Sequence, residues 1–176
     1  MQDNEADTES AASWVEVDLG ALRDNLRALR AALDPRAELI AVVKADAYGH
    51  GATLVARTAA AEGIRRFAVA HPQEAETVRA AVPAADILVI GAAPPSFVPQ
   101  AIERGITLAA ADLEHARALD AAARRAGGRV AVHAKVDTGM GRLGFAWETA
   151  DDEAGRLLDL PGLDVRGVFT HFASVT

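Results

Sequence analysis

Residues 41–51 read AVVKADAYGHG, an apolar β-type run that ends at Lys44 and is followed by a glycine-rich turn. Side chains alternate faces along a strand, so Ile40, Val42 and Lys44 are expected on one side. Lys44 then lies at the carboxyl end of the strand, where α/β folds place their active sites. Packing gives no reason for an amine here, so the ammonium must be either paired or used.

Two interpretations of Lys44 stay open on these residues. The structural one is a salt bridge to a neighbouring acid such as Asp46. The functional one is a desolvated amine of lowered pKa, which can form a Schiff base with a carbonyl compound. Tyr48 is the only tyrosine of the chain. Its hydroxyl either binds a phosphate or shuttles a proton, or it is an ordinary surface group of the turn.

Outward from this segment, the chain repeats a short apolar strand followed by an alanine-rich helix. The strands are predicted at residues 38–45, 66–70, 86–90, 105–109, 129–137 and 163–170. The helices are predicted at residues 52–62, 72–81, 96–104, 112–126 and 147–158. Ahead of them, residues 14–18 alternate like a half-exposed strand, and Asp18 is expected to cap a helix that runs to about Leu33.

Strands that are apolar throughout and joined by helices indicate a parallel sheet covered on both faces. A doubly wound open sheet and a (β/α)8 barrel both fit this pattern. No GxGxxG motif follows the first strand, which disfavours the nucleotide-binding fold. About six strand–helix units are present, about two fewer than a closed barrel needs. The predicted fold class is therefore α/β, an incomplete TIM barrel.

The predicted strand at residues 129–137, RVAVHAKVD, carries three ionisable side chains on one face. His133, Lys135 and Asp137 lie on this face because side chains alternate. Burying three such groups on a central strand is costly unless they are paired. This face is therefore expected to line a polar cavity or network.

The next segment, TGMGRLGF (residues 138–145), packs three glycines around Met140 and Arg142. Glycines let the backbone approach a ligand closely, and Arg142 offers a fixed fork of donors to an oxyanion or carboxylate. A glycine-rich turn with a solvated arginine is the alternative. Further on, His171 lies at the carboxyl end of the strand that contains GVFTHF (residues 167–172). Its imidazole could act as an acid–base group or stack on a flat ring, and the alternative is a core histidine with satisfied hydrogen bonds.

Composition limits the remaining classes of function. The formal net charge is −7, and residues 1–10 hold four acids and no base, so residues 1–13 are predicted to be a disordered acidic tail. The mildly acidic remainder, the domain at residues 14–176, argues against a nucleic-acid or anionic-membrane partner. No cysteine is present, which excludes disulfides and thiolate metal sites. No stretch resembles a membrane span or a signal peptide, so a cytoplasmic location is expected.

Three motifs together resemble alanine racemase, a pyridoxal-phosphate enzyme of fold type III. They are AVVKADAYGHG, HAKVDTGMGRLGF and GVFTHFAS, in that order, and WVEVDLGALRDNL (residues 14–26) is similar to the family's first segment. The similarity runs from about residue 14 to about residue 173. It implies pyridoxal 5′-phosphate as cofactor and the interconversion of L-alanine and D-alanine, which supplies D-alanine for peptidoglycan. It implies no metal.

The resemblance assigns roles to the candidate residues. Lys44 would carry the cofactor as an internal aldimine and act as one of two racemisation bases, while Tyr48 would bind the cofactor phosphate. Arg142 would bond the phenolic oxygen of the cofactor. Lys135 matches a lysine that is often carbamylated and positions that arginine. His171 would stack or hydrogen-bond near the pyridine ring.

The resemblance thus implies three catalytic residues, Lys44, Arg142 and His171. It implies five cofactor-binding residues, namely Lys44, Tyr48, Ile90, Arg142 and His171, of which Ile90 matches an apolar position beside the cofactor. Lys135, Asp137 and Met140 would support the site.

Members of the family have a complete eight-stranded barrel followed by a C-terminal β-domain, and they form homodimers. Their second base is a tyrosine of the C-terminal domain, contributed across the dimer interface. Residues 1–176 contain neither the last two barrel strands nor that domain, and Tyr48 lies in the Lys44 loop. We therefore expect this chain to be inactive by itself.

Three alternative functions stay open. One is a non-catalytic module that binds pyridoxal phosphate or a complementary chain. Another is a broad-specificity amino-acid racemase, because substrate selectivity lies largely in the missing parts. The last is a cofactor-free Schiff-base enzyme of the barrel-aldolase kind, which the DTGMGRLGF motif disfavours.

Overall fold

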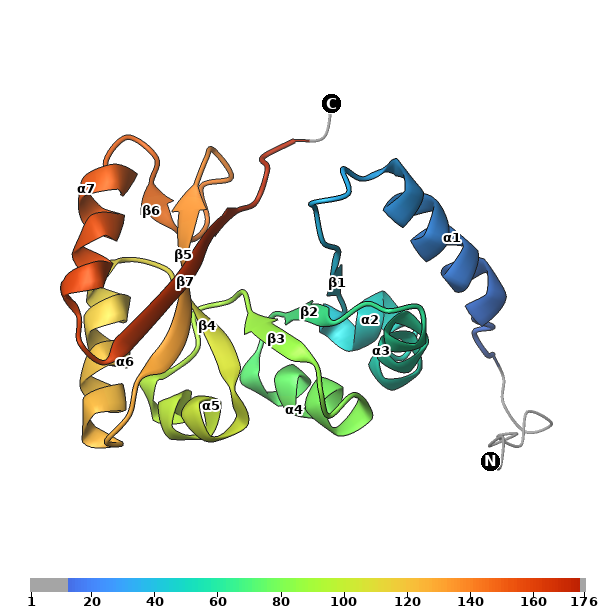
Figure 1. The fold of residues 1–176 in the computed structure, drawn as a ribbon, viewed down its shortest axis with the longest axis horizontal. Coiled ribbons are helices and arrows are strands. Elements are labelled where there is room, and N and C mark those ends of the chain that lie inside the picture. Colours follow the sequence, from blue (N-terminus) through green and yellow to red (C-terminus); the bar gives the residue numbers. More distant parts are fainter. Residues whose placement is uncertain (1–12, 175–176) are drawn as a thin grey trace.

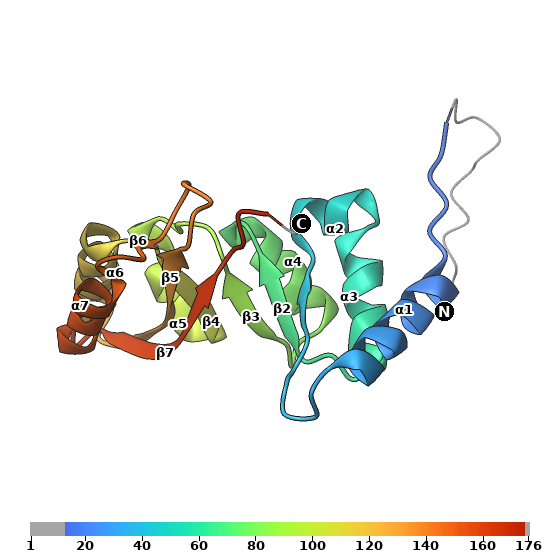
Figure 2. The same ribbon diagram turned by 90° about the horizontal axis from the view of Figure 1, so that it is seen from above.

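The computed structural model describes residues 13–174, and a curved parallel sheet runs through them. Six strands follow one another across this sheet in chain order (Figures 1 and 2). They are β1 (Ile40–Val42), β2 (Arg66–Val69), β3 (Asp86–Val89), β4 (Ile106–Ala110), β5 (Val130–Asp137) and β7 (Leu163–Thr170). A doubly wound sheet needs a point where the strand order reverses, and none occurs among these strands. The sheet is therefore that of an incomplete TIM barrel, as predicted.

Helices follow the strands on the outer side of the curve, where Figure 1 shows α3 to α6. The helices are α1 (Leu19–Ala32), α2 (Lys44–Gly49), α3 (Ala52–Ala61), α4 (Pro72–Ala81), α5 (Val98–Arg104), α6 (Leu113–Arg125) and α7 (Ala150–Gly155). Two short 3-10 helices, η2 (Pro95–Phe97) and η3 (Arg156–Asp159), precede α5 and follow α7. The helix predicted at residues 147–158 is thus two shorter helical pieces.

The hydrophobic core lies between the sheet and these helices. Phe67, Val69, Val89 and Leu108 are fully buried there, against alanine-rich helix faces. Small alanine side chains let the helices pack close to the sheet. Leu88, which alternates with Val89, instead belongs to the concave face of the sheet.

The sheet has two open edges. Within residues 13–174, β1 pairs only with β2, and β7 pairs only with β5. At these edges, Val42 and Val168 are 42% and 66% exposed. A closed barrel has no such edges, so the concave face and both edge strands are accessible here.

One short strand was not predicted. β6 (Phe145–Ala146) pairs with Val136 and Asp137 at the carboxyl end of β5. Val136 also pairs with Thr170 of β7, so β6 and β7 lie on opposite sides of β5. Two residues carry too little alternation to be recognised from sequence.

The strand predicted at residues 14–18 is wrong. Residues 13–18 have no regular secondary structure, and Trp14 and Val15 are 63% and 79% exposed. A strand exists only with a partner, and no described strand pairs with this segment. Most of the predicted acidic tail, residues 1–12, lies outside the described residues.

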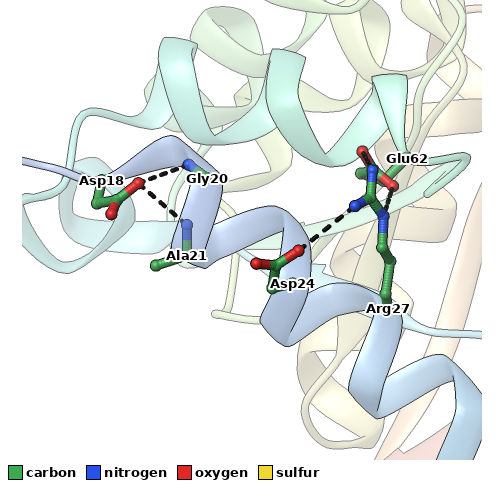
Figure 3. Close-up of polar contacts among 6 residues, drawn as sticks. All are labelled: Asp18, Gly20, Ala21, Asp24, Arg27 and Glu62. Carbon is green, nitrogen blue, oxygen red and sulfur yellow. Dashed lines mark hydrogen bonds and ion pairs between the residues drawn. The ribbon is translucent and has the colours of Figure 1, made fainter.

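The predicted cap of the first helix is confirmed. The Asp18 carboxylate accepts hydrogen bonds from the backbone N–H groups of Gly20 (2.7 Å) and Ala21 (3.0 Å) (Figure 3). Further along α1, Arg27 donates two hydrogen bonds of 2.9 Å to the Glu62 carboxylate, just beyond α3. No residue of α1 is fully buried, so polar contacts help to join it to the rest of the fold. Besides this forked contact, Arg30 donates a hydrogen bond to the Glu62 carbonyl, and Leu26 packs against the core.

Candidate active site

A cavity of about 340 Å³ opens on the concave face at the carboxyl ends of the strands. Five of the predicted site residues line it: Lys44, Ile90, Lys135, Arg142 and His171. They come from four separate stretches of sequence, at the ends of β1, β3, β5 and β7. Parallel strands bring their carboxyl ends to one edge, which explains the convergence.

Lys44 begins α2, whose residues form a left-handed turn and not an ordinary right-handed helix, rather than ending a long strand. Ala45, Asp46, Ala47 and Tyr48 have φ values of 50°, 53°, 54° and 56°. Each non-glycine residue in this region costs about 1–2 kcal/mol, so surrounding contacts must hold the turn. The strand predicted to reach residue 45 therefore ends at Val42, although Lys44 still lies beside Val42 in the cavity.

The Lys44 ammonium is not paired with Asp46. The Asp46 carboxylate accepts a 2.6 Å hydrogen bond from the backbone N–H of Ala52, at the start of α3. Lys44 makes no ion pair with any residue of the described range 13–174. Its Nζ lies 5.8 Å from the ring centroid of Tyr48. The salt-bridge interpretation thus fails, and the amine faces the cavity.

Lys135 is the second amine at this cavity and is only 5% exposed. Its Nζ lies 5.0 Å from the ring centroid of Phe169, on the neighbouring strand β7. Burial lowers the pKa of Lys135, and the positive charge of Arg142 lowers it further, while Asp137 opposes both. Lys44 and Lys135 are the only lysines of the sequence, so both of its side-chain amines meet at one site.

Asp137 folds the glycine-rich loop that carries Arg142. Its carboxylate accepts three backbone hydrogen bonds of 3.0 Å, from Gly139, Gly141 and Arg142. These bonds hold the pKa of Asp137 below its ordinary value. The carboxylate is thus engaged by the loop backbone, and Arg142 is placed at the rim beside Lys135.

His133 lies apart from this cavity, although it was predicted to share a polar face with Lys135. It lines a separate hollow of about 240 Å³ toward the amino-terminal ends of the strands, with Arg66 and Arg166. Burial lowers the pKa of His133, and the two arginines add to the effect. His133 and Lys135 of β5 therefore lie in two different layers of the barrel interior.

A further hollow of about 380 Å³ lies between the end of α1 and the start of β2, lined by Arg30, Glu38 and Arg66. It is slightly larger than the Lys44 cavity. It lies at the amino-terminal ends of the strands, however. In TIM barrels the residues at that end contribute to stability, and the active site lies at the carboxyl ends. The Lys44 cavity is therefore the candidate active site.

Residues 17–176 match the N-terminal domain of alanine racemase. The chain belongs to the alanine racemase family. The alanine racemase of Desulforamulus reducens is 42% identical over 165 residues, which are 92% of this chain and 44% of that protein. The chain thus spans less than half the length of this relative.

Solved structures of racemases have the same fold. Alanine racemase from Clostridium difficile 630 superposes with a TM-score of 0.84 at 34% identity, over 94% of this chain and 44% of that one. Histidine racemase from Leuconostoc mesenteroides subsp. sake superposes with a TM-score of 0.80 at 29% identity, over 89% and 42%. The incomplete barrel is thus the N-terminal part of a racemase barrel.

Three predicted site residues of this racemase domain lie outside the cavity lining, namely Tyr48, Met140 and the loop-folding Asp137. Tyr48 is 60% exposed, and only its ring contact to Lys44 connects it to the site. Met140 is partly buried within the loop that Asp137 folds. The role of Tyr48 in binding phosphate and the supporting role of Met140 stay predictions.

Phe169 and Gly91 also line the cavity, although neither was predicted as a site residue. Alternation places Phe169 on the face of His171, but only the structure shows its ring beneath Lys135. A Cβ at Gly91 would lie 2.4 Å from the backbone oxygen of Ala70, so only glycine fits there. An isolated glycine after a strand gives no such signal in the sequence.

No described helix is long and apolar enough to cross a membrane. Among residues 13–174, no group of three or more His, Cys, Asp or Glu side chains has the arrangement of a metal site.

Replacing Asp137 by Asn is expected to loosen residues 139–142, because the amide NH2 would meet backbone donors. The amide oxygen can still accept from Gly139 and Gly141, which share Oδ1, so the lost partner is Arg142 N–H. Amide hydrogen exchange at Arg142 should lose about tenfold protection or more. Asp34→Asn, at a carboxylate paired with Arg36, is the control and should leave this loop unchanged.

The pH dependence gives the same test a second readout. The pKa of Asp137 is lower in the folded protein than in the unfolded chain. Its carboxylate therefore stabilises the folded loop at pH values above the pKa of the unfolded chain, and this stabilisation is lost as the pH falls through the folded-state pKa. Protection of the loop in the unmodified chain should therefore decline only in acid, below the ordinary Asp range. Equal protection in Asp137→Asn and the unmodified chain at neutral pH would contradict the role of Asp137.

Proposed function

We propose that this chain is the N-terminal part of a pyridoxal-phosphate-dependent amino-acid racemase that interconverts L-alanine and D-alanine. The observation that carries the proposal is the cavity where unpaired Lys44 meets Lys135, Arg142 and His171. Racemisation needs a base at the substrate Cα and donors for the negative charge that forms. The family supplies the substrate assignment.

The residues present fit pyridoxal phosphate. The cavity volume of about 340 Å³ is within the range of small-molecule sites, about 300–1,000 Å³. Lys44 offers an amine for the cofactor aldehyde, Ile90 an apolar wall and Arg142 a donor for the phenolic oxygen. Tyr48, beside Lys44 on the turn, is the one residue of this set proposed to donate a hydrogen bond to the cofactor phosphate.

When bound, pyridoxal phosphate delocalises the negative charge left at Cα. The protein has to remove the proton on one face and return one on the other. We assign the base on one face to Lys44, whose amine is held at the cavity without an ion pair. Arg142 orients the bound molecule, and Lys135 beside it positions Arg142. His171 closes the rim of the cavity.

The second base is assigned to sequence beyond residues 1–176. The chain spans 44% of the Desulforamulus reducens enzyme, and the concave face is open at both sheet edges. The remaining barrel strands, a C-terminal domain and a second subunit would complete the site. Homodimer formation and the supply of D-alanine for peptidoglycan belong to this same proposal.

The likeness to histidine racemase supports a second candidate, a racemase of broader amino-acid specificity. The same N-terminal half-barrel serves alanine in one named relative and histidine in the other. The residues that choose the side chain would then lie in the other half of the barrel. Comparing turnover of alanine and histidine by the complete protein separates the two candidates.

Treatment with pyridoxal phosphate and then borohydride is expected to attach the cofactor to Lys44. Peptide mass mapping is unambiguous because Lys135 is the only other lysine. Lys44→Arg should abolish the label, whereas Lys135→Arg should retain it on Lys44. A label on Lys135 or on the N-terminal amine in the unmodified chain would refute the assignment of Lys44.

A further inference from the structure

Glu74, in the first turn of α4, contacts three backbone amides that belong to two different loops. Its Oε1 accepts a 2.7 Å hydrogen bond from Ala45 N–H, the residue directly after Lys44. Its Oε2 accepts hydrogen bonds from the N–H groups of Ala70 (2.7 Å) and His71 (2.9 Å). One carboxylate therefore joins the Lys44 turn to the loop between β2 and α4.

The contact to Ala45 falls where the backbone is most strained. Ala45 is the first of four successive non-glycine residues with positive φ. At the other end of this turn, Asp46 accepts a hydrogen bond from Ala52 N–H. Backbone hydrogen bonds from Ala47 to Val43 and from Gly51 to Asp46 also hold the turn. Glu74 supplies the side-chain anchor on the Lys44 side, and Asp46 supplies the side-chain anchor on the α3 side.

The carboxylate is chemically suited to this place. It has two oxygens that only accept, and all three partners are N–H donors. A glutamine would turn an NH2 group toward one of these donors, and an aspartate would be one methylene too short. Burial raises the pKa of Glu74, but the three backbone hydrogen bonds together outweigh burial and hold the pKa below its ordinary value, so the group stays ionised at neutral pH.

We propose that Glu74 is a positioning residue that holds the Lys44 amine at the cavity by anchoring the left-handed turn at Ala45. The catalytic meaning of this role rests on the proposed function of Lys44. The claim that Glu74 fixes the position of the Lys44 amine does not depend on the proposed function, because it concerns only where the amine lies. Glu74 itself does not line the Lys44 cavity and acts through the backbone.

The test compares Glu74→Gln with a matched control on the same helix. Glu76 is two residues away and forms an ion pair with Arg104, far from the Lys44 turn in sequence. Glu76→Gln removes the same charge and leaves the three amide contacts of Glu74 in place. Differences between the two variants therefore report the contacts and not the loss of a negative charge from α4.

Two readouts are expected to move in opposite directions. Acetylation by acetic anhydride, mapped by mass spectrometry, should rise at Lys44 relative to Lys135 in Glu74→Gln, by about threefold or more, because the turn opens. Borohydride-trapped pyridoxal phosphate on Lys44 should fall about tenfold, since the amine is no longer held in place. Glu76→Gln should match the unmodified chain in both.

Amide hydrogen exchange at Ala45 and the shorter variant Glu74→Asp test the same contact independently of lysine labelling. Exchange at the Ala45 amide should accelerate in Glu74→Gln, and Glu74→Asp should fall between Gln and the unmodified chain. Unchanged acetylation and exchange in Glu74→Gln would overturn the proposal. An equal rise in acetylation at Lys44 and Lys135 would also overturn it, because it shows global loosening. If the unmodified chain takes no pyridoxal phosphate at Lys44, the proposed function fails while acetylation still tests Glu74.

Discussion

Purified residues 1–176, given pyridoxal phosphate, are expected to racemise L-alanine no faster than the free cofactor does. In the proposed function Lys44 supplies the base for one face of Cα, and the second base is assigned to sequence beyond residues 1–176. Lys135 and His171 line the same concave face as Lys44. A positioned general acid or base contributes about 10²–10⁴-fold to a rate. The open sheet also leaves the substrate in water, which weakens the electrostatic contribution of Arg142. Chiral chromatography of alanine over time measures the rate.

The control restores the missing half. Residues 1–176 joined to the remaining C-terminal part of the Desulforamulus reducens enzyme should exceed the isolated chain by about 10²-fold or more. Lys44→Arg in that chimera should return the rate to background. Turnover by the isolated chain that disappears in Lys44→Arg would contradict the prediction, because it would show that both bases lie within residues 1–176.

The sequence alone was enough to predict which residues meet at the cavity. Lys44 and His171 were each predicted at the carboxyl end of a strand, and parallel strands must bring such ends together. Lys135 was predicted on the polar face of another strand, and the family resemblance placed it at the site. Strand alternation is local, so it can be read without knowledge of distant contacts. The same reasoning gave the open barrel, since each strand–helix unit carries its own pattern.

Contacts between distant segments could not be predicted in this way. Ala45, Ala47 and Tyr48 have no preference for left-handed backbone, and the anchor at Glu74 comes from another unit of the fold. The first-turn position of Glu74 predicts only a favourable helix start. The same limit explains the wrong strand at residues 14–18, whose alternation has no neighbouring strand to pair with.

His133 shows a further limit of strand alternation. The pattern puts His133 and Lys135 on one face, which is correct, but successive positions on that face are about 7 Å apart along a strand. This distance separates two layers of a barrel interior. Lys135 therefore lies at the candidate active site, while His133 lies with Arg66 and Arg166 in the other hollow.

Gly144→Ala is expected to lower the free energy of unfolding by about 3–4 kcal/mol, a large effect for one methyl group. Gly144 has a φ of 130°, which side chains rarely tolerate. Its Cβ would lie 2.6 Å from Asp137 N, 2.8 Å from Val136 C and 2.9 Å from Lys135 O. All three are backbone atoms of β5, which cannot turn away as a flexible side chain would.

Gly141→Ala is the matched control in the same loop. Gly141 has a φ of 68°, and a Cβ there would meet no atom within 4 Å. Its expected cost is only the left-handed backbone, about 1–2 kcal/mol. Urea unfolding followed by far-UV circular dichroism measures both variants. Equal destabilisation would show that the close approach to β5 is unimportant and that positive φ alone governs this loop.

The difference between the two glycines also bears on the site. The backbone contact at Gly144 fixes where the loop leaves β5, and Phe145, the next residue, is buried and begins β6. Arg142 is therefore held between the Asp137 carboxylate on one side and this contact on the other. Gly144→Ala should displace Arg142 from Lys135 even in molecules that stay folded. Pyridoxal phosphate should then be trapped on Lys44 less efficiently in Gly144→Ala than in Gly141→Ala at a temperature where both are folded.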